Sequence, residues 1–133
     1  MIESISKVVV RYSETDMMGI VYHANYLPWL EIGRTQMLRE HGVPYSEMEA
    51  QGILLPVLEI SMKYRRPARY DEEITIITRM HQKPFVKIHL DYEVKKGDEL
   101  LATAKSMHAF MNRSAQPIKT PRYFLDAISQ KFA

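Results

Sequence analysis

The spacing of hydrophobic and polar residues changes twice along this chain. Residues 7–12 alternate weakly and are rich in valine, which predicts a first strand with Val8 and Val10 on one face. From residue 26 to about residue 41, apolar residues recur at the spacing of a helix. This helix is apolar over more than half of its circumference, so we expect other structure to cover most of it. One face carries Tyr26, Leu30, Gly33 and Met37.

Local signals delimit the predicted helices. Asn25 is suited to cap the long helix, and Pro28 falls in the first turn, where no backbone donor is needed. Gly42 and Pro44 end the helix. A short second helix is predicted over residues 45–50.

After residue 52 the spacing becomes that of strands. Alternating apolar and polar residues predict four strands, at residues 58–65, 74–79, 86–95 and 100–111. Short turns, such as Lys96-Gly97-Asp98, make neighbouring strands antiparallel. The last of these strands is apolar on both faces, which predicts a more central place in the sheet. A short C-terminal helix is predicted over residues 123–131.

The predicted order of one strand, a long helix and four strands indicates an α+β architecture. The antiparallel sheet needs a cover for its apolar face, and the long helix can provide one. Gly33 costs about 1 kcal/mol of helix propensity relative to alanine, which is understandable if the helix backbone lies close to the sheet there. The length of 133 residues suits one core, so we expect residues 1–133 to form a single domain.

Composition excludes several classes of function. Zero cysteines rule out disulfides, thiol catalysis and thiolate metal sites. A formal net charge of +2, with acids and bases mixed along the chain, gives no reason to expect a nucleic-acid partner. The longest apolar runs are far shorter than the ~20 residues of a membrane span, so no membrane partner is expected. The N-terminal residues lack the pattern of a secretory signal, which predicts a cytoplasmic location.

The sequence also lacks the common cofactor motifs. The five histidines have no spacing that suggests a metal site, and no HExxH pair is present. Glycine-rich phosphate loops and the serine-hydrolase elbow are absent as well. We therefore expect neither a metal nor a bound cofactor.

The densest group of chemically active residues lies just before the long helix. An aspartate in such a loop, here Asp16, is more often a turn or cap residue. However, the first N–H groups of a helix lack internal partners and can hold a developing oxyanion. A carboxylate beside them could attack an acyl group or deprotonate water. Asp16 with the amides near Tyr22 and His23 is therefore predicted to form an acyl-hydrolysis centre, and Gly19 lets the loop turn.

Other side chains in this stretch have two interpretations. His23 either bonds a carbonyl of the loop or orients a substrate carbonyl and relays a proton. Glu31 lies eight residues further on, roughly on the same helix face, and is either a solvated charge or a substrate contact. Tyr12 and Tyr22 are best explained as packing residues that offer a hydroxyl contact.

Two stretches resemble recurring segments of a known family. Residues 16–34, DMMGIVYHANYLPWLEIGR, resemble the signature of hotdog-fold thioesterases of the 4-hydroxybenzoyl-CoA type. Residues 64–71, YRRPARYD, are similar to a second segment of that family. The resemblance extends along nearly the whole chain. It implies the hotdog fold, an antiparallel sheet wrapped around one long helix, and hydrolysis of an acyl-CoA to a free acid and CoA without a metal or cofactor.

The resemblance also implies roles for residues. Asp16 would act as nucleophile or general base, and the amide at His23 would polarise the thioester carbonyl. The histidine form of the motif is similar to the branch that acts on short or medium acyl-CoAs, in which Tyr12 also lines the site. The site expected from residues and resemblance together comprises Asp16, His23 and Tyr12 as catalytic residues and Gly19, Tyr22 and Glu31 as substrate contacts.

The family further implies assembly and substrate contacts. Its members pair their sheets into homodimers, often pair dimers into homotetramers, and place active sites at the subunit interface. The CoA phosphates would meet basic surface residues, for which the candidates are Lys63, Arg66, Lys83 and Lys87.

Two alternative functions fit the same sequence. The acyl donor could be an acyl carrier protein, with basic surface residues docking an acidic partner. The chain could also bind acyl-CoA without cleaving it. A dehydratase is less expected, because no second acid–base pair is visible on the helix.

Overall fold

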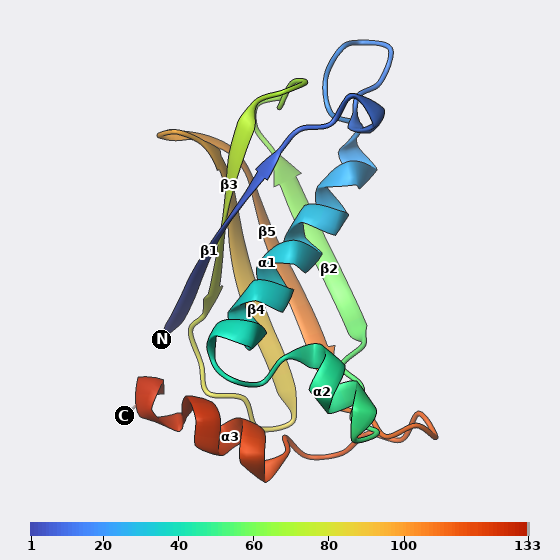
Figure 1. Ribbon diagram of the computed structural model, residues 1–133, viewed down its shortest axis with the longest axis vertical. Helices are drawn as coiled ribbons and strands as arrows, with labels where there is room; N and C mark the ends of the chain where they lie inside the picture. The colour runs from blue at the N-terminus through green and yellow to red at the C-terminus, as the bar shows by residue number, and fades with distance from the viewer. Residues whose placement is uncertain (133) are drawn as a thin grey trace.

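The alternating segments form one antiparallel sheet that curves around a long helix in the computed structural model, which describes residues 1–132 (Figure 1). The strands are β1 (Ile2–Val9), β2 (Val57–Tyr64), β3 (Glu73–Met80), β4 (Lys87–Lys96) and β5 (Glu99–Ala109). The helices are α1 (Tyr26–Glu40), α2 (Tyr45–Ala50) and α3 (Arg122–Ile128), with 3-10 turns at Tyr12–Glu14, His23–Asn25 and Ser129–Phe132. The strand order is β1-β3-β4-β5-β2, so β4 is central and β1 and β2 are the edges. The predicted α+β hotdog architecture is confirmed.

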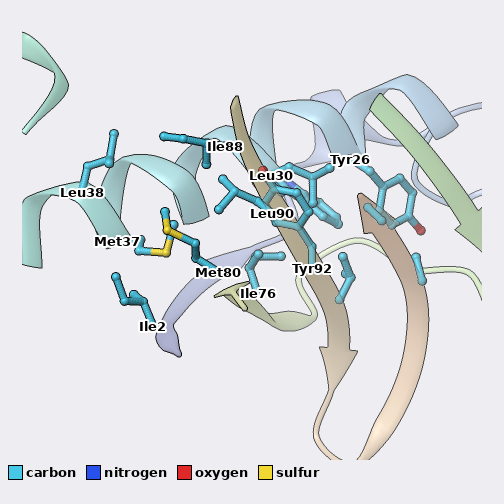
Figure 2. Close-up of a cluster of buried hydrophobic side chains, with 14 of the residues drawn as sticks. Ile2, Tyr26, Leu30, Met37, Leu38, Ile76, Met80, Ile88, Leu90 and Tyr92 are labelled. Carbon is cyan, nitrogen blue, oxygen red and sulfur yellow. The ribbon is translucent and has the colours of Figure 1, made fainter. Parts of the chain in front are cut away.

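The core lies between α1 and the concave face of the sheet. Every second residue is buried over residues 74–80 of β3 and residues 88–94 of β4, as the alternation predicted. Figure 2 shows Met37 of α1, Met80 of β3 and Leu90 of β4 pointing toward one another in this layer. The predicted apolar face of α1 is buried at all four positions, Tyr26, Leu30, Gly33 and Met37.

Gly33 lets the backbone of α1 lie close against the sheet. A Cβ atom at this position would lie 2.4 Å from Oγ1 of Thr78 and 3.1 Å from Cγ2 of Ile76, both on β3. Such a contact is far shorter than van der Waals distance, so a larger residue would push the helix away. The prediction that the helix backbone lies against a sheet at Gly33 is confirmed.

The first strand lies further toward the N-terminus than predicted. It covers Ile2–Val9 instead of residues 7–12, because two serines occupy its buried face and hide the apolar alternation. Ser4 is accommodated there because its hydroxyl donates to Glu40 Oε2 at 2.9 Å. Val10, on the same face, is buried as expected, but residue 12 already begins a 3-10 turn.

The edge strand β2 is exposed on both faces. α1 packs mainly against β1 and β3, near the opposite edge of the sheet, and β2 is exposed along most of its length (Figure 1). Four large apolar residues of β2 are 36–48% exposed, namely Val57, Leu58, Ile60 and Tyr64. β5 is paired on both sides, but its outer face carries the exposed Lys105, so the prediction that both faces are apolar is wrong.

The ends of the helices differ slightly from expectation. Asn25 is the N-cap residue of α1, but its side chain does not cap the helix and instead donates to the carbonyl of Glu14 at 2.8 Å. α2 has the predicted bounds, and the C-terminal helix is a shorter α-helix that continues as a 3-10 turn. In the described part of the chain, no helix has both the length and the apolarity required to cross a bilayer.

Candidate active site

The two stretches that carry the family resemblance lie side by side. The loop after β1 is bonded to the segment that follows β2, since the Val21 N–H donates to the carbonyl of Ala68 at 2.9 Å. The Ala68 N–H in turn donates to the hydroxyl of Tyr26 at 3.3 Å, and the Asp71 N–H donates to the carbonyl of Val10 at 2.9 Å. These bonds fix the loop that carries Asp16 between the start of α1 and the end of β2.

Asp16 begins a tight turn at the tip of this loop. Its Oδ1 accepts the N–H of Met18 at 2.8 Å, and its carbonyl accepts the N–H of Gly19 at 3.0 Å. Gly19 has φ +77°, a left-handed conformation that suits glycine. The second carboxylate oxygen, Oδ2, accepts no hydrogen bond from residues 1–132. Asp16 therefore shapes the turn with one oxygen and keeps the other available for chemistry.

A buried glutamate ties this loop to the helix. Glu14 is 6% exposed, and its carboxylate accepts the Arg11 backbone N–H at 2.7 Å and the indole N–H of Trp29 at 2.9 Å. Its carbonyl accepts the Tyr22 N–H at 2.9 Å and the side-chain amide of Asn25 at 2.8 Å. Sequence reasoning missed Glu14, although a lone tryptophan needs a partner for its N–H when buried.

The backbone at His23 offers a free donor in the pocket of Asp16. His23 opens the 3-10 turn that leads into α1. The neighbouring N–H of Tyr22 is already bonded to Glu14, whereas the His23 N–H has no hydrogen-bond acceptor among the described residues. The predicted pair of amides is thus reduced to the one at His23. The imidazole is exposed and packs against the Tyr22 ring, with ring centroids 4.4 Å apart.

Asp16 and His23 share an open pocket of about 310 Å³. Tyr64, at the end of β2, lines this pocket, and its hydroxyl donates to the carbonyl of His23 at 2.9 Å. Its ring also packs against Tyr26, with centroids 5.2 Å apart. Burial raises the pKa of both phenols, so both are neutral near pH 7. Sequence reasoning did not place Tyr64 in the site, because only the fold brings the end of β2 to this loop.

The other predicted site residues lie outside this pocket. Tyr12 is 77% exposed and packs edge to face against Tyr70, with ring centroids 5.7 Å apart. Glu31 lines a different cavity, beneath the middle of α1. Glu31 was expected on the same helix face as His23 because eight residues make about two α-helical turns. Residues 23–25 instead form a 3-10 turn with about three residues per turn, so this spacing no longer brings the two side chains to one face.

Two arginines supply positive charge beside Asp16. Arg65 and Arg66 line the pocket and are exposed, and Arg66 is one of the four basic residues singled out from the sequence. Lys63 lines a separate depression with Asp91 and Lys105, and Lys83 and Lys87 line another with His89. Nowhere in residues 1–132 do three or more His, Asp or Glu side chains gather in a way that could hold a metal ion.

A second cavity of about 250 Å³ lies between α1 and the sheet. Apolar residues from β3 and β4 form much of its wall, including Met80, Ile88 and Leu90 (Figure 2). Its polar wall residues are Glu31, Arg34, Thr35, Tyr45 and His108. His108 is 1% exposed, and burial, with Arg34 nearby, lowers its pKa to about 4, so the ring is neutral near pH 7.

The Asp16 pocket combines groups that suit attack on an activated carbonyl. It holds a carboxylate with one free oxygen, an unpaired backbone N–H, a neutral phenol and two arginines. The carboxylate can act as nucleophile or base, and the N–H can donate to an oxyanion. The arginines favour a substrate that carries negative charge outside the reacting group.

Comparison with known proteins agrees with this chemistry. A model of the family described as Thioesterase-like superfamily matches residues 10–131. The protein named "Putative acyl-CoA thioesterase YneP" of Bacillus subtilis is 39% identical over 122 residues, which are 90% of this chain and 88% of that protein. The crystal structure of a DHNA-CoA thioesterase from Staphylococcus aureus is 32% identical, with a TM-score of 0.92 over 99% of this chain and 92% of that one. A chloroplastic acyl-acyl carrier protein thioesterase of Arabidopsis thaliana is 25% identical over 114 residues, 84% of this chain and 60% of that protein.

Proposed function

Because the chain belongs to the thioesterase-like superfamily, we propose that it hydrolyses acyl-CoA thioesters to free acids and CoA in the Asp16 pocket. The chain is a thioester hydrolase, the class named for its relatives. The observation that carries the assignment of the site is the free Oδ2 of Asp16 in the same pocket as the His23 amide.

Two routes use these groups. In the nucleophilic route, Oδ2 of Asp16 attacks the thioester carbon, the electron pair of the C=O moves onto oxygen, and the C–S bond then breaks to release CoA thiolate. Water cleaves the resulting anhydride and regenerates the carboxylate. In the general-base route, Asp16 takes a proton from the water that attacks the thioester carbon, and the tetrahedral intermediate then breaks its C–S bond, so that the free acid and CoA thiolate leave and the thiolate takes up the proton. In both routes the His23 N–H donates to the oxyanion, and Tyr64 holds the carbonyl of His23 in place.

Isotope labelling distinguishes the two routes. Single-turnover hydrolysis in H₂¹⁸O incorporates the label directly into the product acid if Asp16 is a base. If Asp16 is the nucleophile and water attacks its own carboxyl carbon, the label first enters Asp16.

Arg65 and Arg66 are proposed to contact the phosphates of CoA. Both line the pocket, so a pantetheine chain leaving Asp16 has a short path to them. Of the four basic residues that the sequence suggested as phosphate contacts, Arg66 keeps this proposed role. Lys63, Lys83 and Lys87 line other depressions of the same chain and are given no phosphate contact there.

A homodimer is proposed through β2. Its outer edge is unpaired in the described chain, and its exposed apolar residues make a lone edge strand prone to association. Pairing with the same strand of a second copy about a two-fold axis is antiparallel. The start of β2, at Val57, then lies beside the end of the partner strand, where Tyr64 lines the Asp16 pocket. Two such dimers are proposed to form a homotetramer.

Two observations bear on the kind of acyl group that the enzyme cleaves. The histidine at position 23 favours short or medium acyl-CoAs, whereas the Staphylococcus aureus relative is named for an aryl substrate, DHNA-CoA. The 4-hydroxybenzoyl-CoA type belongs to the aryl group and is kept as a candidate. We further propose a single hotdog domain over residues 1–133 that acts in the cytoplasm without metal or cofactor.

Release of free thiol from a panel of aliphatic and aromatic acyl-CoAs tests the function. Wild type is compared with Asp16→Asn, in which the amide oxygen still accepts the Met18 N–H and keeps the turn. The loss of base or nucleophile is expected to lower the rate at least ~100-fold. Asp98→Asn, in the exposed turn after β4, is the matched control. Equal rates for Asp16→Asn and wild type would exclude Asp16, and tight binding without thiol release would favour a binding module.

The carrier-protein alternative is favoured by the Arabidopsis relative, which is named for an acyl-acyl carrier protein substrate. The same acyl group is presented on CoA and on carrier protein, and kcat/KM is compared. A higher kcat/KM with carrier protein would show that the acyl-acyl carrier protein, and not acyl-CoA, is the preferred substrate.

A further inference from the structure

A chain of hydrogen bonds ends at the wall of the second cavity. Arg34 Nη1 donates to the hydroxyl of Tyr92 at 3.4 Å, the Tyr92 and Ser106 hydroxyl oxygens are 2.6 Å apart, and Ser106 Oγ lies 2.7 Å from His108 Nε2. Tyr92, Ser106 and His108 are each at most 4% exposed. The chain thus crosses from α1 to β4 and β5 inside the protein.

The direction of these bonds follows from the number of protons. The guanidinium of Arg34 has only donors, so the Tyr92 oxygen accepts from it. A buried hydroxyl proton needs an acceptor, and the one available to Tyr92 among the described residues is Ser106 Oγ. The Ser106 proton is then left with His108 Nε2 as its acceptor. Nε2 of the neutral ring is therefore unprotonated, and Nδ1 carries the proton.

The Nδ1–H of His108 has no partner. It lies near the carbonyl of Pro56 without reaching hydrogen-bond geometry with any described residue. His108 and Pro56 both line the second cavity, so this unpaired donor lies at its wall. An unsatisfied buried donor costs roughly 1–3 kcal/mol, which a ligand oxygen can recover. Arg34 lines the same cavity and forms no ion pair with residues 1–132.

The second cavity is at the opposite end of β2 from the Asp16 pocket. Pro56 and Val57, before and at the start of β2, line the cavity, whereas Tyr64, at the end of β2, lines the pocket of Asp16. In one chain the two spaces share no lining residue. In the proposed antiparallel β2 pair, the cavity of one copy comes next to the Asp16 pocket of the other.

We propose that the cavity receives the distal part of the acyl group bound at Asp16 of the partner copy, and that His108 selects acyl groups with a hydroxyl or keto oxygen there. The rest of the wall is apolar and suits the hydrocarbon part of the group. Glu31, at the same cavity, disfavours a carboxylate and can accept from a hydroxyl. This inference rests on the proposed thioesterase function and names its substrate class.

Matched substrate pairs test the selection. Thiol release is measured with benzoyl-CoA and its ring-hydroxylated form, and with hexanoyl-CoA and its hydroxylated form. Wild type is expected to favour at least one oxygenated member by about tenfold in kcat/KM, the equivalent of one net hydrogen bond. His108→Phe is expected to lose this preference, because the ring no longer offers an N–H to the substrate oxygen. His89→Phe, on the exposed face of β4, is the matched control and keeps the preference.

A second variant covers the case in which His108→Phe does not fold. Thr35, half-buried on α1, lines the cavity without joining the hydrogen-bond chain. Thr35→Phe is expected to fill the cavity and to lower kcat/KM for the benzoyl and hexanoyl substrates at least tenfold more than for acetyl-CoA. Equal effects on acetyl-CoA and the larger substrates would overturn the placement of the acyl group.

Mixed dimers test the contribution of the partner copy. Asp16→Asn and His108→Phe chains are co-expressed with different tags, and the heterodimer is purified. If His108 serves Asp16 of the partner, one site in the heterodimer is fully wild type and restores the preference for the oxygenated substrate. A heterodimer without preference would overturn the inference. Thiol release by wild type without any preference would overturn this inference alone, whereas no release from any acyl-CoA would overturn the proposed function as well.

Discussion

The indole N–H of Trp29 donates to the buried carboxylate of Glu14 at 2.9 Å and so joins α1 to the loop that carries Asp16. The same glutamate accepts the backbone N–H of Arg11, and its carbonyl occupies the N–H of Tyr22. With the Tyr22 N–H occupied, the N–H of His23 stays free in the pocket of Asp16. Glu14 therefore removes the Tyr22 amide from the donors available to an oxyanion, although it lies outside the pocket itself.

Replacement of Glu14 by glutamine is expected to damage both folding and catalysis. The two oxygens of the carboxylate each accept one N–H group. Glutamine replaces one of these oxygens by an NH₂ group, so that two donors then face each other. We expect a loss of about 1–3 kcal/mol in unfolding free energy. We also expect a lower kcat with a smaller change in KM, because the loop is misplaced in the folded enzyme. Thermal melts and steady-state thiol release measure the two effects.

Glu73→Gln is the matched control for this change. Glu73 is exposed and pairs with Lys7 at 3.5 Å, so its loss should alter neither quantity measurably. A folded Glu14→Gln enzyme with the wild-type kcat would contradict a positioning role for Glu14.

Tyr64→Phe tests the support of the His23 carbonyl. The variant keeps the ring packing against Tyr26 and removes only the hydroxyl that donates to that carbonyl. A hydrogen bond of about 1 kcal/mol corresponds to roughly a fivefold lower kcat if it serves to orient the peptide. The readout is kcat for the best acyl-CoA of the panel, and Tyr70→Phe, at an exposed phenol, is the control. An unchanged kcat would exclude Tyr64 from the catalytic geometry.

Ile60→Lys is expected to prevent dimerisation. Ile60 lies in the middle of β2 and is 36% exposed, so a charge there opposes pairing of this edge with a second copy. Analytical ultracentrifugation should show a dimer or tetramer for wild type and a monomer for the variant, with lower thiol release. Ile5→Lys, on the other edge strand and 55% exposed, should retain the wild-type assembly. A dimeric Ile60→Lys would show that another surface forms the contact.

Stability is expected to fall with acid because of His108. Its pKa is about 4 in the folded protein and about 6.5 when the chain is unfolded, so between these values the unfolded state binds the extra proton. The stabilisation of the neutral ring is therefore complete above pH 6.5 and is lost as the pH falls toward 4, by about 3 kcal/mol in total. Urea unfolding at pH 7 and pH 4.5 measures it.

His108→Phe should lose part of this pH dependence, whereas His89→Phe, at an exposed position, should retain most of it, because His89 is the smallest of the causes that lower the His108 pKa. Equal pH dependence in wild type and His108→Phe would show that other groups cause the acid sensitivity.

Gly33→Ala is expected to destabilise the fold although alanine favours helices. The new Cβ would lie 2.4 Å from Thr78 Oγ1, and the strain of about 1–3 kcal/mol exceeds the gain of about 1 kcal/mol in helix propensity. Urea unfolding measures the change. The double variant Gly33→Ala/Thr78→Ala should recover part of the loss, because the clashing hydroxyl is removed and has no hydrogen-bond partner in the described structure. Additive losses would argue against the contact.

Much of the fold could be predicted because burial imposes periodic patterns. The helix face from Tyr26 to Met37 and the alternation of β3 and β4 both reflect a single apolar layer. The apolar alternation failed to reveal a strand where a buried position holds a polar residue with a hydrogen-bond partner. Ser4, in the buried face of β1, bonds Glu40 on α1, a partner 36 residues away that no local pattern shows.

The site was predictable only in its local part. Asp16 and His23 belong to one loop, and their proximity follows from short spacing. Glu14 and Tyr64 act through contacts with Trp29 and His23 that the chain makes over 15 and 41 residues, so neither could be recognised from spacing. Glu31 and His23 line different cavities, because the start of the helix winds as a 3-10 turn and changes the spacing on which their shared face was predicted.

Tyr64 belongs to two structures at once, the edge strand β2 and the wall of the Asp16 pocket. In the proposed dimer, a substrate that spans both copies binds the associated state better than the separate chains. Thermodynamic linkage then requires that the substrate tighten the association by the same factor. Specific activity should consequently fall on dilution of the enzyme and recover with saturating substrate, so that assembly and turnover become a single concentration-dependent equilibrium.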